Sequence, residues 1–400
     1  MPCVLPPELL THIVAQLDPD HDDARAALLA TAAASRAMTY LCQERLYRTA
    51  NVRTDRLPST NAHFAAFPHL AAHVVEVQLE YAEASECDLL DVLLARFSNV
   101  RVFSVKGQGR WSTIEEKFGA AVEERWRHGG LRRVSLCGFR EVPAEVLMLF
   151  WGASRDVTLF DVTVALEEED DHIAAETINP ISRLATSVPT LHPPLLRVLL
   201  PHAAALRSLT ITDLGLAPTA LIGPLLCITA NTLTHLSLTL SPHAPPSGCR
   251  SESPILLPFL PQLFSLSLHF SFPDPRVCNA PESHPPPPLL LALLAALLLG
   301  TPALRRLVLR PAVPVCTECR THVPPVGGAL GELDALVAGY IGMCPAPVST
   351  RKACWVPRFV YADGERTGEE VDLGEYSAAM CGAMPWAMKL GMRVLADSDG

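Results

Sequence analysis

The residues with the clearest potential for chemistry are two cysteines and a nearby histidine. Cys316 and Cys319 are separated by two residues, and His322 follows after two more. Two thiolates at this spacing can bind one face of a zinc ion, His322 could be a third ligand, and Cys344 or Cys354 a fourth. A complete zinc site usually has a second close ligand pair, so burial of the cysteines as small hydrophobic side chains is the competing interpretation. We expect no cofactor and keep Cys316, Cys319 and His322 only as a candidate metal site.

Motifs of known catalytic machinery are missing from the sequence. It contains no G-x-S-x-G nucleophile turn, no H-E-x-x-H zinc pair and no phosphate loop that ends in Gly-Lys-Ser or Gly-Lys-Thr. Gly107 and Gly109 lack the third glycine of a dinucleotide-binding fingerprint, and we expect them in a turn. The sequence therefore predicts a protein that is not an enzyme.

A second group of chemically useful residues lies next to regularly spaced apolar positions. The candidates for contact with a protein target are Arg132, Arg207, His235, Phe264 and Arg305. Arginine can pair with carboxylate or phosphate groups, and the serines and threonines around these positions can hydrogen-bond a peptide. The competing interpretation is that any solvated sheet face needs polar residues. We expect these residues to form a binding surface for an unidentified protein.

These candidates depend on a repeated segment of the form apolar-x-x-apolar-x-apolar. It occurs as Val74/Val77/Leu79, Val100/Phe103/Val105, Leu131/Val134/Leu136, Val157/Phe160/Val162, Leu206/Leu209/Ile211, Leu233/Leu236/Leu238, Leu263/Leu266/Leu268 and Leu304/Leu307/Leu309. The five shorter steps between starts are 26 to 31 residues long, which is the length of a strand plus a helix and is typical of a long leucine-rich repeat. The two longer steps contain an acidic insertion (167–172) and a proline-rich insertion (272–288).

Segments of helical length separate several of these strands. They are 87–97, 113–127, 144–150, 218–228 and 289–299. We therefore predict an α/β fold (α+β overall), an irregular leucine-rich-repeat-like solenoid over 54–345 with a parallel sheet on its concave face. A strand near 355–361 and a helix broken at Pro385 are expected within a C-terminal cap or tail, 346–400.

The first fifty residues follow a different pattern. After Pro7, five apolar residues fall on one helical face, namely Leu9, Leu10, Ile13, Val14 and Leu17. An alanine-rich segment (24–34) and a further apolar stripe (38–46) indicate two more short helices. The sequence predicts a separate three-helix domain over residues 1–53.

Several motifs in this domain resemble those of a known family. They are Leu5-Pro6-Pro7-Glu8-Leu9-Leu10, Ala34-Ser35-Arg36 and Gln43-Glu44-Arg45-Leu46-Tyr47-Arg48. Together they resemble the F-box of fungal F-box-like proteins, over roughly residues 3–53. In that family the F-box docks onto the Skp adaptor of a cullin-based ubiquitin ligase, and the rest of the chain recruits a substrate. The resemblance implies that the adaptor contacts are Leu5, Pro6, Leu9, Leu10, Ile13, Leu28 and Leu29.

Two positions depart from the usual family pattern. Ala34 and Met38 stand where the family has a cysteine and an aromatic residue. The alternative interpretation is therefore a scaffold or interaction protein whose F-box-like helices no longer bind the adaptor and only cap the next domain.

Composition restricts the other partners. The 400 residues are 49% hydrophobic and carry a net charge of −10, which removes the basic footprint that nucleic-acid binding requires. The longest apolar run, Leu289–Leu299, has 11 residues where about 20 are needed to cross a bilayer, so we expect a buried helix and no membrane partner. The N-terminus lacks the features of a secretory signal, and we expect a cytoplasmic or nuclear protein that is not secreted.

Overall fold

The computed structural model describes most of the chain. The described residues are 7–19, 21–82, 87–114, 116–127, 130–165, 180–214, 218–240, 257–272, 288–315, 330–342, 351–361 and 373–396. The chain forms two compact units, unit 1 (Met1–Asn179) and unit 2 (Pro180–Gly400). Both combine helices with parallel strands, which confirms the α/β class. The candidate zinc residues Cys316, Cys319 and His322 lie outside the described residues, as do the acidic insertion and nearly all of the proline-rich insertion.

Unit 1 begins with the three expected helices, α1 (Pro7–Gln16), α2 (Asp22–Ala34) and α3 (Arg36–Leu46). They enclose a small core of Val14, Leu28, Met38 and Cys42, and five partly buried apolar side chains pack against it. The Arg45 Nε atom of α3 donates a hydrogen bond of 3.0 Å to the carbonyl oxygen that follows α1. Each helix is short, so the three helices are stabilised mainly by packing their apolar side chains against one another.

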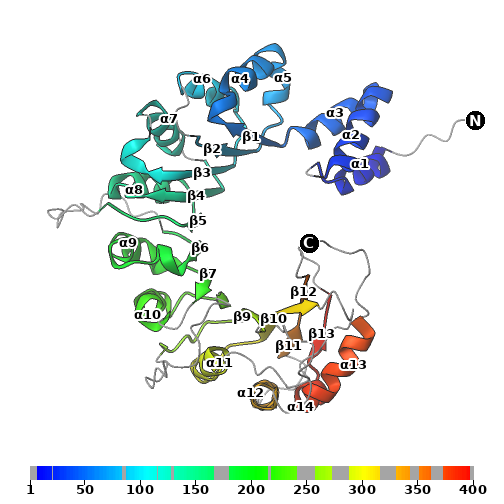
Figure 1. Ribbon diagram of the computed structural model, residues 1–400, viewed down its shortest axis with the longest axis vertical. Coiled ribbons are helices and arrows are strands. Elements are labelled where there is room, and N and C mark those ends of the chain that lie inside the picture. Colours follow the sequence, from blue (N-terminus) through cyan, green and yellow to red (C-terminus); the bar gives the residue numbers. More distant parts are fainter. Residues whose placement is uncertain are drawn as a thin grey trace, which may run out of the picture. The chain divides into compact units, whose positions relative to one another are not determined.

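The rest of unit 1 alternates strands with helices. The strands are β1 (Thr49–Arg53), β2 (Glu76–Glu80), β3 (Val102–Arg110), β4 (Arg133–Arg140) and β5 (Asp156–Phe160), and neighbours in this order pair in parallel. Between them lie η1 (Thr54–Arg56), α4 (Leu57–Ala66), α5 (Pro68–Ala71), α6 (Leu90–Arg96), η2 (Trp111–Thr113), α7 (Glu116–Arg127) and α8 (Ala144–Ala153). Figure 1 shows α6, α7 and α8 along one side of β2 to β5. Alternate strand residues such as Val77 and Leu79 are buried on that side.

The glycines at 107 and 109 lie within β3, so the prediction of a turn is wrong. The register between β3 and β4 shifts between Lys106 and Gly109, and Gly109 has a φ of 124°. A Cβ atom at Gly107 would lie 2.5 Å from the Phe139 ring, so only glycine allows this close approach. The glycines therefore form a strand irregularity that makes room for a buried aromatic side chain.

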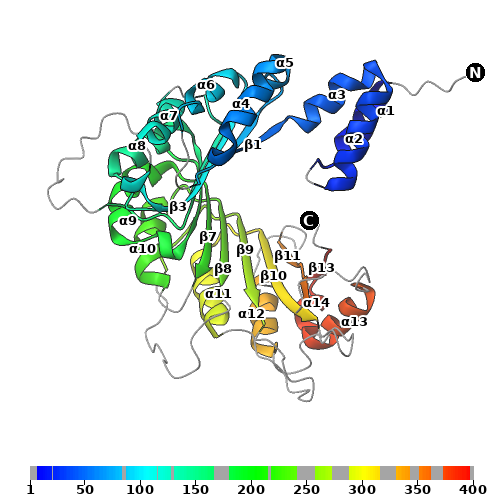
Figure 2. The same cartoon turned by 45° about the horizontal axis from the view of Figure 1, so that its top comes forward.

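Unit 2 continues the alternation of strands and helices. Its strands are β6 (Arg183–Ser187), β7 (Ser208–Leu214), β8 (His235–Leu240), β9 (Ser265–Ser271), β10 (Arg306–Val315), β11 (Lys352–Trp355), β12 (Arg358–Tyr361) and β13 (Arg393–Val394). The pairing is parallel in sequence order, except that β12 pairs with β10 and β13 with β11. The helices are η3 (Val188–Thr190), α9 (Pro193–Leu199), η4 (Leu200–Ala205), α10 (Pro218–Thr229), α11 (Pro288–Gly300), α12 (Gly331–Gly342), α13 (Leu373–Ala383) and α14 (Pro385–Lys389). Figure 2 shows α10 and α11 on one side of the strands β7 to β10.

The C-terminal part of unit 2 contains the predicted strand and the helix that is broken at Pro385. Trp355 at the end of β11 is fully buried, and its Nε1 donates a hydrogen bond of 3.1 Å to the Tyr376 hydroxyl. Burial raises the pKa of Tyr376 to about 12, although the hydrogen bond from Trp355 opposes this shift. The Asp334 carboxylate on α12 is also buried and accepts hydrogen bonds from the backbone N–H groups of Trp386 and Ala387 at 3.1 and 2.7 Å. These contacts attach α14 to α12.

Three parts of the predicted repeat pattern differ from the structure. In β5 the buried residue is Leu159 and not Phe160, so that unit begins at Ser154. The long step after it contains the unpredicted strand β6, in which Leu184 is buried but the next core position is Thr186. The prediction also missed β1, which lies inside the expected 1–53 domain and pairs with β2. The separation of a helical domain at residue 53 stays a prediction.

The apolar run 289–299 lies in α11, as expected. Leu290, Leu293, Leu294 and Leu297 are buried on one side of the helix, whereas Leu299 is exposed. Among the described helices none has both the length and the apolar character needed to span a bilayer.

Candidate binding surfaces

The first candidate surface consists of three exposed leucine or isoleucine side chains on the N-terminal helices. Leu9 and Ile13 of α1 are 50% and 49% exposed, and Leu29 of α2 is 51% exposed. Leu9 and Ile13 are four residues apart and therefore lie on the same face of α1. Since isolated apolar residues are common on surfaces, the significant feature is that two large ones share one helical face beside a completed core.

The other predicted adaptor contacts have different positions. Leu28 is fully buried in the core of the three helices, and Leu10 is partly buried against that core. Their side chains hold the helices together and offer little or no surface to a partner. Leu5 and Pro6 lie outside the described residues. The apolar stripe of α1 is therefore divided between an inner row with Leu10 and Val14 and an outer row with Leu9 and Ile13.

The second candidate surface lies at the amino-terminal ends of strands in unit 2. His235, Phe264 and Arg305, three of the predicted target contacts, stand together where β8, β9 and β10 begin. The His235 and Phe264 rings are 6.4 Å apart between centroids, and the Arg305 guanidinium carbon lies 5.9 Å from the centroid of Phe264. This geometry allows a cation–π contact between Arg305 and Phe264. Phe264 is 43% exposed, so an aromatic face is available among polar groups.

Arg207 connects to the same group through backbone hydrogen bonds. Its carbonyl oxygen accepts from the N–H groups of Thr234 and His235, both at 2.9 Å, and from the Thr234 hydroxyl at 2.9 Å. The Thr234 hydroxyl also lies 2.8 Å from the His235 Nδ1 atom. The Thr234 hydroxyl has one hydrogen, which it donates to the Arg207 carbonyl oxygen. In the contact with His235 the Nδ1 atom is therefore the donor and the Thr234 oxygen the acceptor. The His235 ring is thereby fixed with its Nε2 atom directed away from this contact.

Arg132 belongs to the other compact unit. It is exposed just before β4, in the same place relative to its strand that Arg207 has relative to β7. The structure therefore brings four of the five predicted target contacts together in unit 2 and leaves Arg132 in unit 1.

A row of residues beside this group was missed by the sequence prediction. We call it the unit 2 row, and strand register aligns its members as Arg183, Ser208, His235, Ser265, Arg306 and Lys352. Their neighbours Leu184, Leu209 and Leu236 are buried against the helices, so the row lies on the opposite, open face of the sheet. Arg183, His235, Arg306 and Lys352 are exposed. Ser208, His235, Ser265 and Arg306 occupy polar positions of the predicted repeats, and of these only His235 was chosen as a target contact. Arg183 and Lys352 were missed because β6 and β11 lie outside the predicted repeats.

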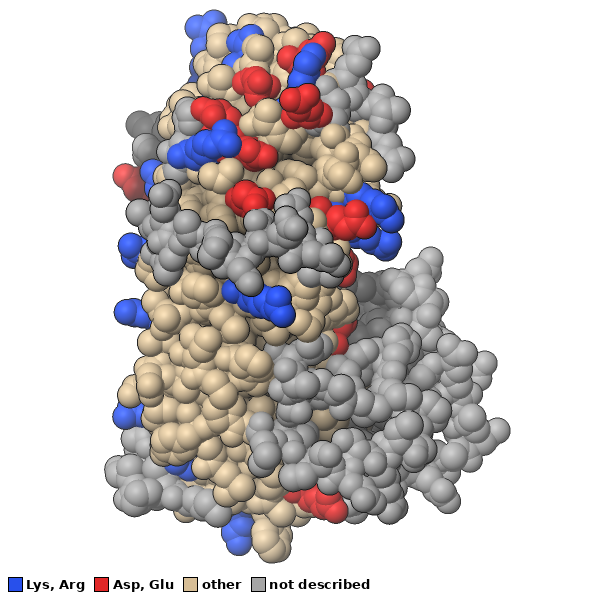
Figure 3. Space-filling view, turned by 90° about the vertical axis from the view of Figure 1, so that its left-hand side faces the viewer, with Lys and Arg blue, Asp and Glu red and all other residues tan. Residues whose placement is uncertain are grey.

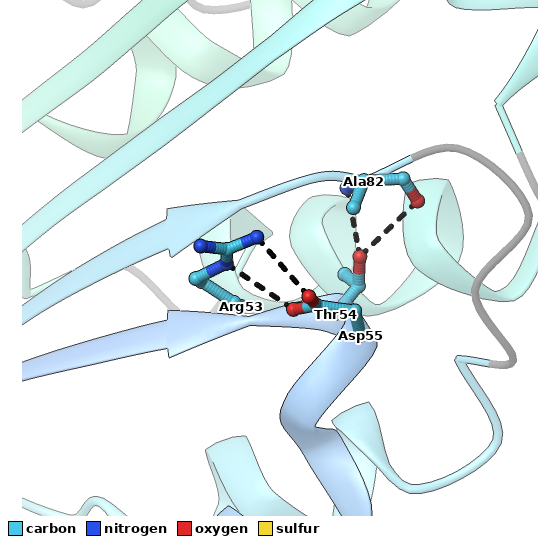
Figure 4. Close-up of polar contacts among 4 residues, drawn as sticks. All are labelled: Arg53, Thr54, Asp55 and Ala82. Carbon is cyan, nitrogen blue, oxygen red and sulfur yellow. Dashed lines mark hydrogen bonds and ion pairs between the residues drawn. The ribbon is translucent and has the colours of Figure 1, made fainter.

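The open face of unit 1 has a different chemical character. Strand register there aligns Glu76 with Val102 and Arg133, and Arg133 forms an ion pair of 3.3 Å with Asp156. At the end of β1, Arg53 donates two hydrogen bonds to Asp55, at 3.2 and 3.1 Å (Figure 4). The same view shows the Thr54 hydroxyl bonded to the backbone of Ala82, which joins the ends of β1 and β2. Arg53 and Arg133 in unit 1 are therefore already paired with neighbouring carboxylates.

Charges are also distributed differently on the helical side. α7 carries both acidic and basic residues, whereas α10 and α11 contain no charged residue at all. Figure 3 shows this side, with mixed charges over the helices of unit 1 and a mainly uncharged described surface over those of unit 2. Residues 180–400 contain 15 basic and 15 acidic side chains, but 11 of the basic and four of the acidic ones lie in the described ranges. These four are Asp213, Glu332, Asp334 and Glu375.

Three of these carboxylates have described side chains, and none of the three is placed to neutralise the unit 2 row. Asp334 is buried against α14, Glu332 is on α12, and Asp213 lies near the carboxyl end of β7, opposite to the end where the row lies. Arg183, Arg306 and Lys352 form no ion pair within the part of the chain that the structure describes. The row can therefore attract anionic groups from outside the chain.

The described residues contain no group of three or more histidine, cysteine, aspartate or glutamate side chains that could hold a metal ion. Cys354, named as a fourth zinc ligand, is buried with Val308 and Val356 in a small apolar cluster. The pKa of Cys137 on β4 is raised by burial and, to a smaller extent, by Asp161, which disfavours a reactive thiolate there. No protein-family model matches the chain, and no curated protein matches it either. The functional argument therefore depends on these two surfaces.

Proposed function

We propose that this protein is the substrate-recognition subunit of an SCF-type cullin ubiquitin ligase. In this proposal the three N-terminal helices are an F-box that binds the Skp adaptor, and the strand and helix repeats form a leucine-rich-repeat-like solenoid whose open face binds a protein target. The chain has no catalytic role of its own and acts inside the cell, in the cytoplasm or the nucleus.

The observation that carries the proposal is the division of the apolar stripe on α1. Val14 lies in the core of the three helices and Leu10 packs against it, while Leu9 and Ile13 remain half-exposed on the outer side. Burial of these two side chains by a partner would contribute about 1 kcal/mol each, since about half of each is still accessible. The resemblance to an F-box places adaptor contacts at these same residues.

The experiment is co-purification of the tagged full chain with purified Skp adaptor and cullin. Leu10 packs against the core, so a charge there would disrupt folding, and the informative variant is Leu9→Asp with Ile13→Asp. A matched control is Leu390→Asp, because Leu390 is also a partly exposed leucine but lies in unit 2. We expect the wild type and the control to retain the adaptor, and the folded double variant to lose at least tenfold in affinity, which corresponds to about 1.4 kcal/mol.

The alternative is a scaffold protein whose helices no longer bind the adaptor. A folded wild-type chain that does not retain the adaptor would support this alternative and would contradict the proposed ligase function. Binding that is unaffected by the double variant would show that the adaptor, if bound, uses another surface.

A further inference from the structure

Helix α11 is apolar on every side. Its 13 residues are proline, leucine, alanine and glycine, so none of them carries a polar side chain. Its four buried leucines lie on one side of the helix. On the other side Ala292 is exposed, Ala295 and Ala296 are partly buried, and Leu299 is 84% exposed. A helix that is apolar all round is normally covered all round, so the outer face of α11 is expected to have a partner.

The surroundings of this outer face are also uncharged. The neighbouring helix α10 contains no charged residue, and its Ile228 is 44% exposed. Phe259 is 60% exposed and lies beside the C-terminal end of α11, where the N–H group of Leu260 donates a hydrogen bond of 2.8 Å to the Gly300 carbonyl oxygen. Figure 3 shows this side, with a mainly uncharged described surface over the helices of unit 2. A partner of this face therefore needs apolar side chains and no charge.

Composition argues against two of the available occupants. The adjacent stretches 241–256 and 273–287, outside the described residues, contain only three large aliphatic residues and no aromatic one, so they supply little apolar side-chain surface. Helices that lie on a lipid surface are typically rich in lysine and arginine beside their apolar face, whereas α10 and α11 contain neither. A second copy of the chain supplies an uncharged apolar face of the same kind.

The outer face of α11 is complementary to itself. Ala292 and Leu299 lie at equal distances on opposite sides of the midpoint between Ala295 and Ala296. When two such helices pack antiparallel about that midpoint, each Leu299 lies opposite the Ala292 of the other copy, so a large side chain meets a small one. We propose that α11 pairs in this way with α11 of a second copy, in a two-fold symmetric dimer that buries no charge in the helix contact.

The test measures the molar mass of the full chain by light scattering after size-exclusion chromatography, without adaptor or cullin. We expect the mass to rise from the monomer value of 43.3 kDa towards twice that value as the concentration is raised to about 100 μM. Leu299→Glu and Ala292→Lys should each weaken the dimer at least about fivefold, because each places a charge against an apolar side chain. Val92→Glu is the matched control, since Val92 is 46% exposed on α6 of unit 1, and it should have no effect.

The combination of both charges in one chain tests the antiparallel arrangement. In the proposed dimer Ala292→Lys of one copy lies opposite Leu299→Glu of the other, so the double variant should recover a dimer within about threefold of the wild-type affinity. In a parallel pair each introduced charge would instead meet its own copy, and the double variant would be weaker than either single variant. Circular dichroism of each variant checks that it is folded.

Three results would overturn the inference. They are a folded wild type that keeps the monomer mass at the highest concentration, a Leu299→Glu variant that dimerises as well as the wild type, and a double variant that is weaker than both single variants. A monomeric wild type that floats with vesicles of phosphatidylcholine and phosphatidylserine would assign the face to lipid and would also overturn it. The inference goes beyond the proposed function and does not depend on it, because the adaptor test concerns α1 in unit 1 and has a separate readout.

Discussion

The open faces of the two units share one strand pattern but differ in how their charges are used. In unit 1 two basic side chains form ion pairs with carboxylates of the same unit, Arg53 with Asp55 and Arg133 with Asp156. In unit 2 Arg183 pairs in register with a serine and Arg306 lies between Ser265 and Lys352, and none of these three cations forms an ion pair within the described residues. A cation that already has a carboxylate partner has less to gain from a ligand than one that has only water.

The comparison shows that the repeat pattern determines which residues lie on the open face, but not which of them can bind a partner. Alternation along each strand sends every second residue to the open face in both units. Which of these residues can bind a partner depends on whether the neighbouring strand or turn supplies the opposite charge. The largest predicted effects below concern the acidic and phenolic groups that unit 2 buries, and the smallest concern the open faces themselves.

The first prediction tests whether Asp334 stabilises unit 2 through its hydrogen bonds to the backbone of α14. Asp334→Ala should lower the free energy of unfolding by about 3 kcal/mol, because a buried and a partly buried backbone N–H group lose a charged acceptor. The exposed Glu332 on the same helix provides the control, and Glu332→Ala should change stability by about 0.5 kcal/mol or less. Urea unfolding measures both. A loss below 1 kcal/mol for Asp334→Ala would contradict this role.

The second prediction concerns Tyr376, a phenol that is buried in unit 2 and affects stability at alkaline pH. The folded state holds the Tyr376 proton up to a pKa of about 12, above the usual value of 10. The contribution of Tyr376 to the free energy of unfolding is therefore complete well below pH 10. About 2 kcal/mol of it is lost as the pH rises from 10 to 12. Tyr376→Phe should remove this part of the pH dependence in denaturation curves. An unchanged slope between pH 10 and 12 would show that the phenol is not responsible.

The third prediction compares the open faces directly. Arg133→Ala should cost about 0.5 kcal/mol, because it breaks an ion pair that is only partly exposed to solvent. Arg306→Ala should leave stability unchanged or raise it by a few tenths of a kcal/mol, since Arg306 lies directly opposite Lys352. Thermal unfolding of the two variants in low salt gives the difference. Equal losses of stability would remove the contrast between paired and unpaired cations.

Much of the fold follows from the apolar positions in the sequence. Residues such as Leu209 and Leu236 are predicted and observed in the core, because a buried strand face requires large apolar side chains. The strand β6 was missed since Thr186 occupies a core position where the pattern expects a hydrophobic residue. The register of β5 was misassigned because Phe160 and Leu159 are both apolar and adjacent, and a shift of one residue reverses the faces of a strand.

The candidate surfaces were predictable only in part. The sequence identifies the apolar residues of α1 but cannot divide them between core and surface, because that division depends on how α2 and α3 pack. It identifies Arg207, His235, Phe264 and Arg305 by their place next to a strand, and the structure brings them together. It does not reveal Arg183 and Lys352 as members of the row, since β6 has Thr186 at a core position and β11 lacks the repeat pattern.

The central proposal is that the chain binds an adaptor through the outer face of α1. The most direct measurement is the amount of purified Skp adaptor that co-purifies with the tagged full chain. The account predicts that the wild type and Leu390→Asp retain the adaptor in equal amount to the chain, and that the folded variant with Leu9→Asp and Ile13→Asp loses it. A folded wild-type chain that does not retain the adaptor would contradict it.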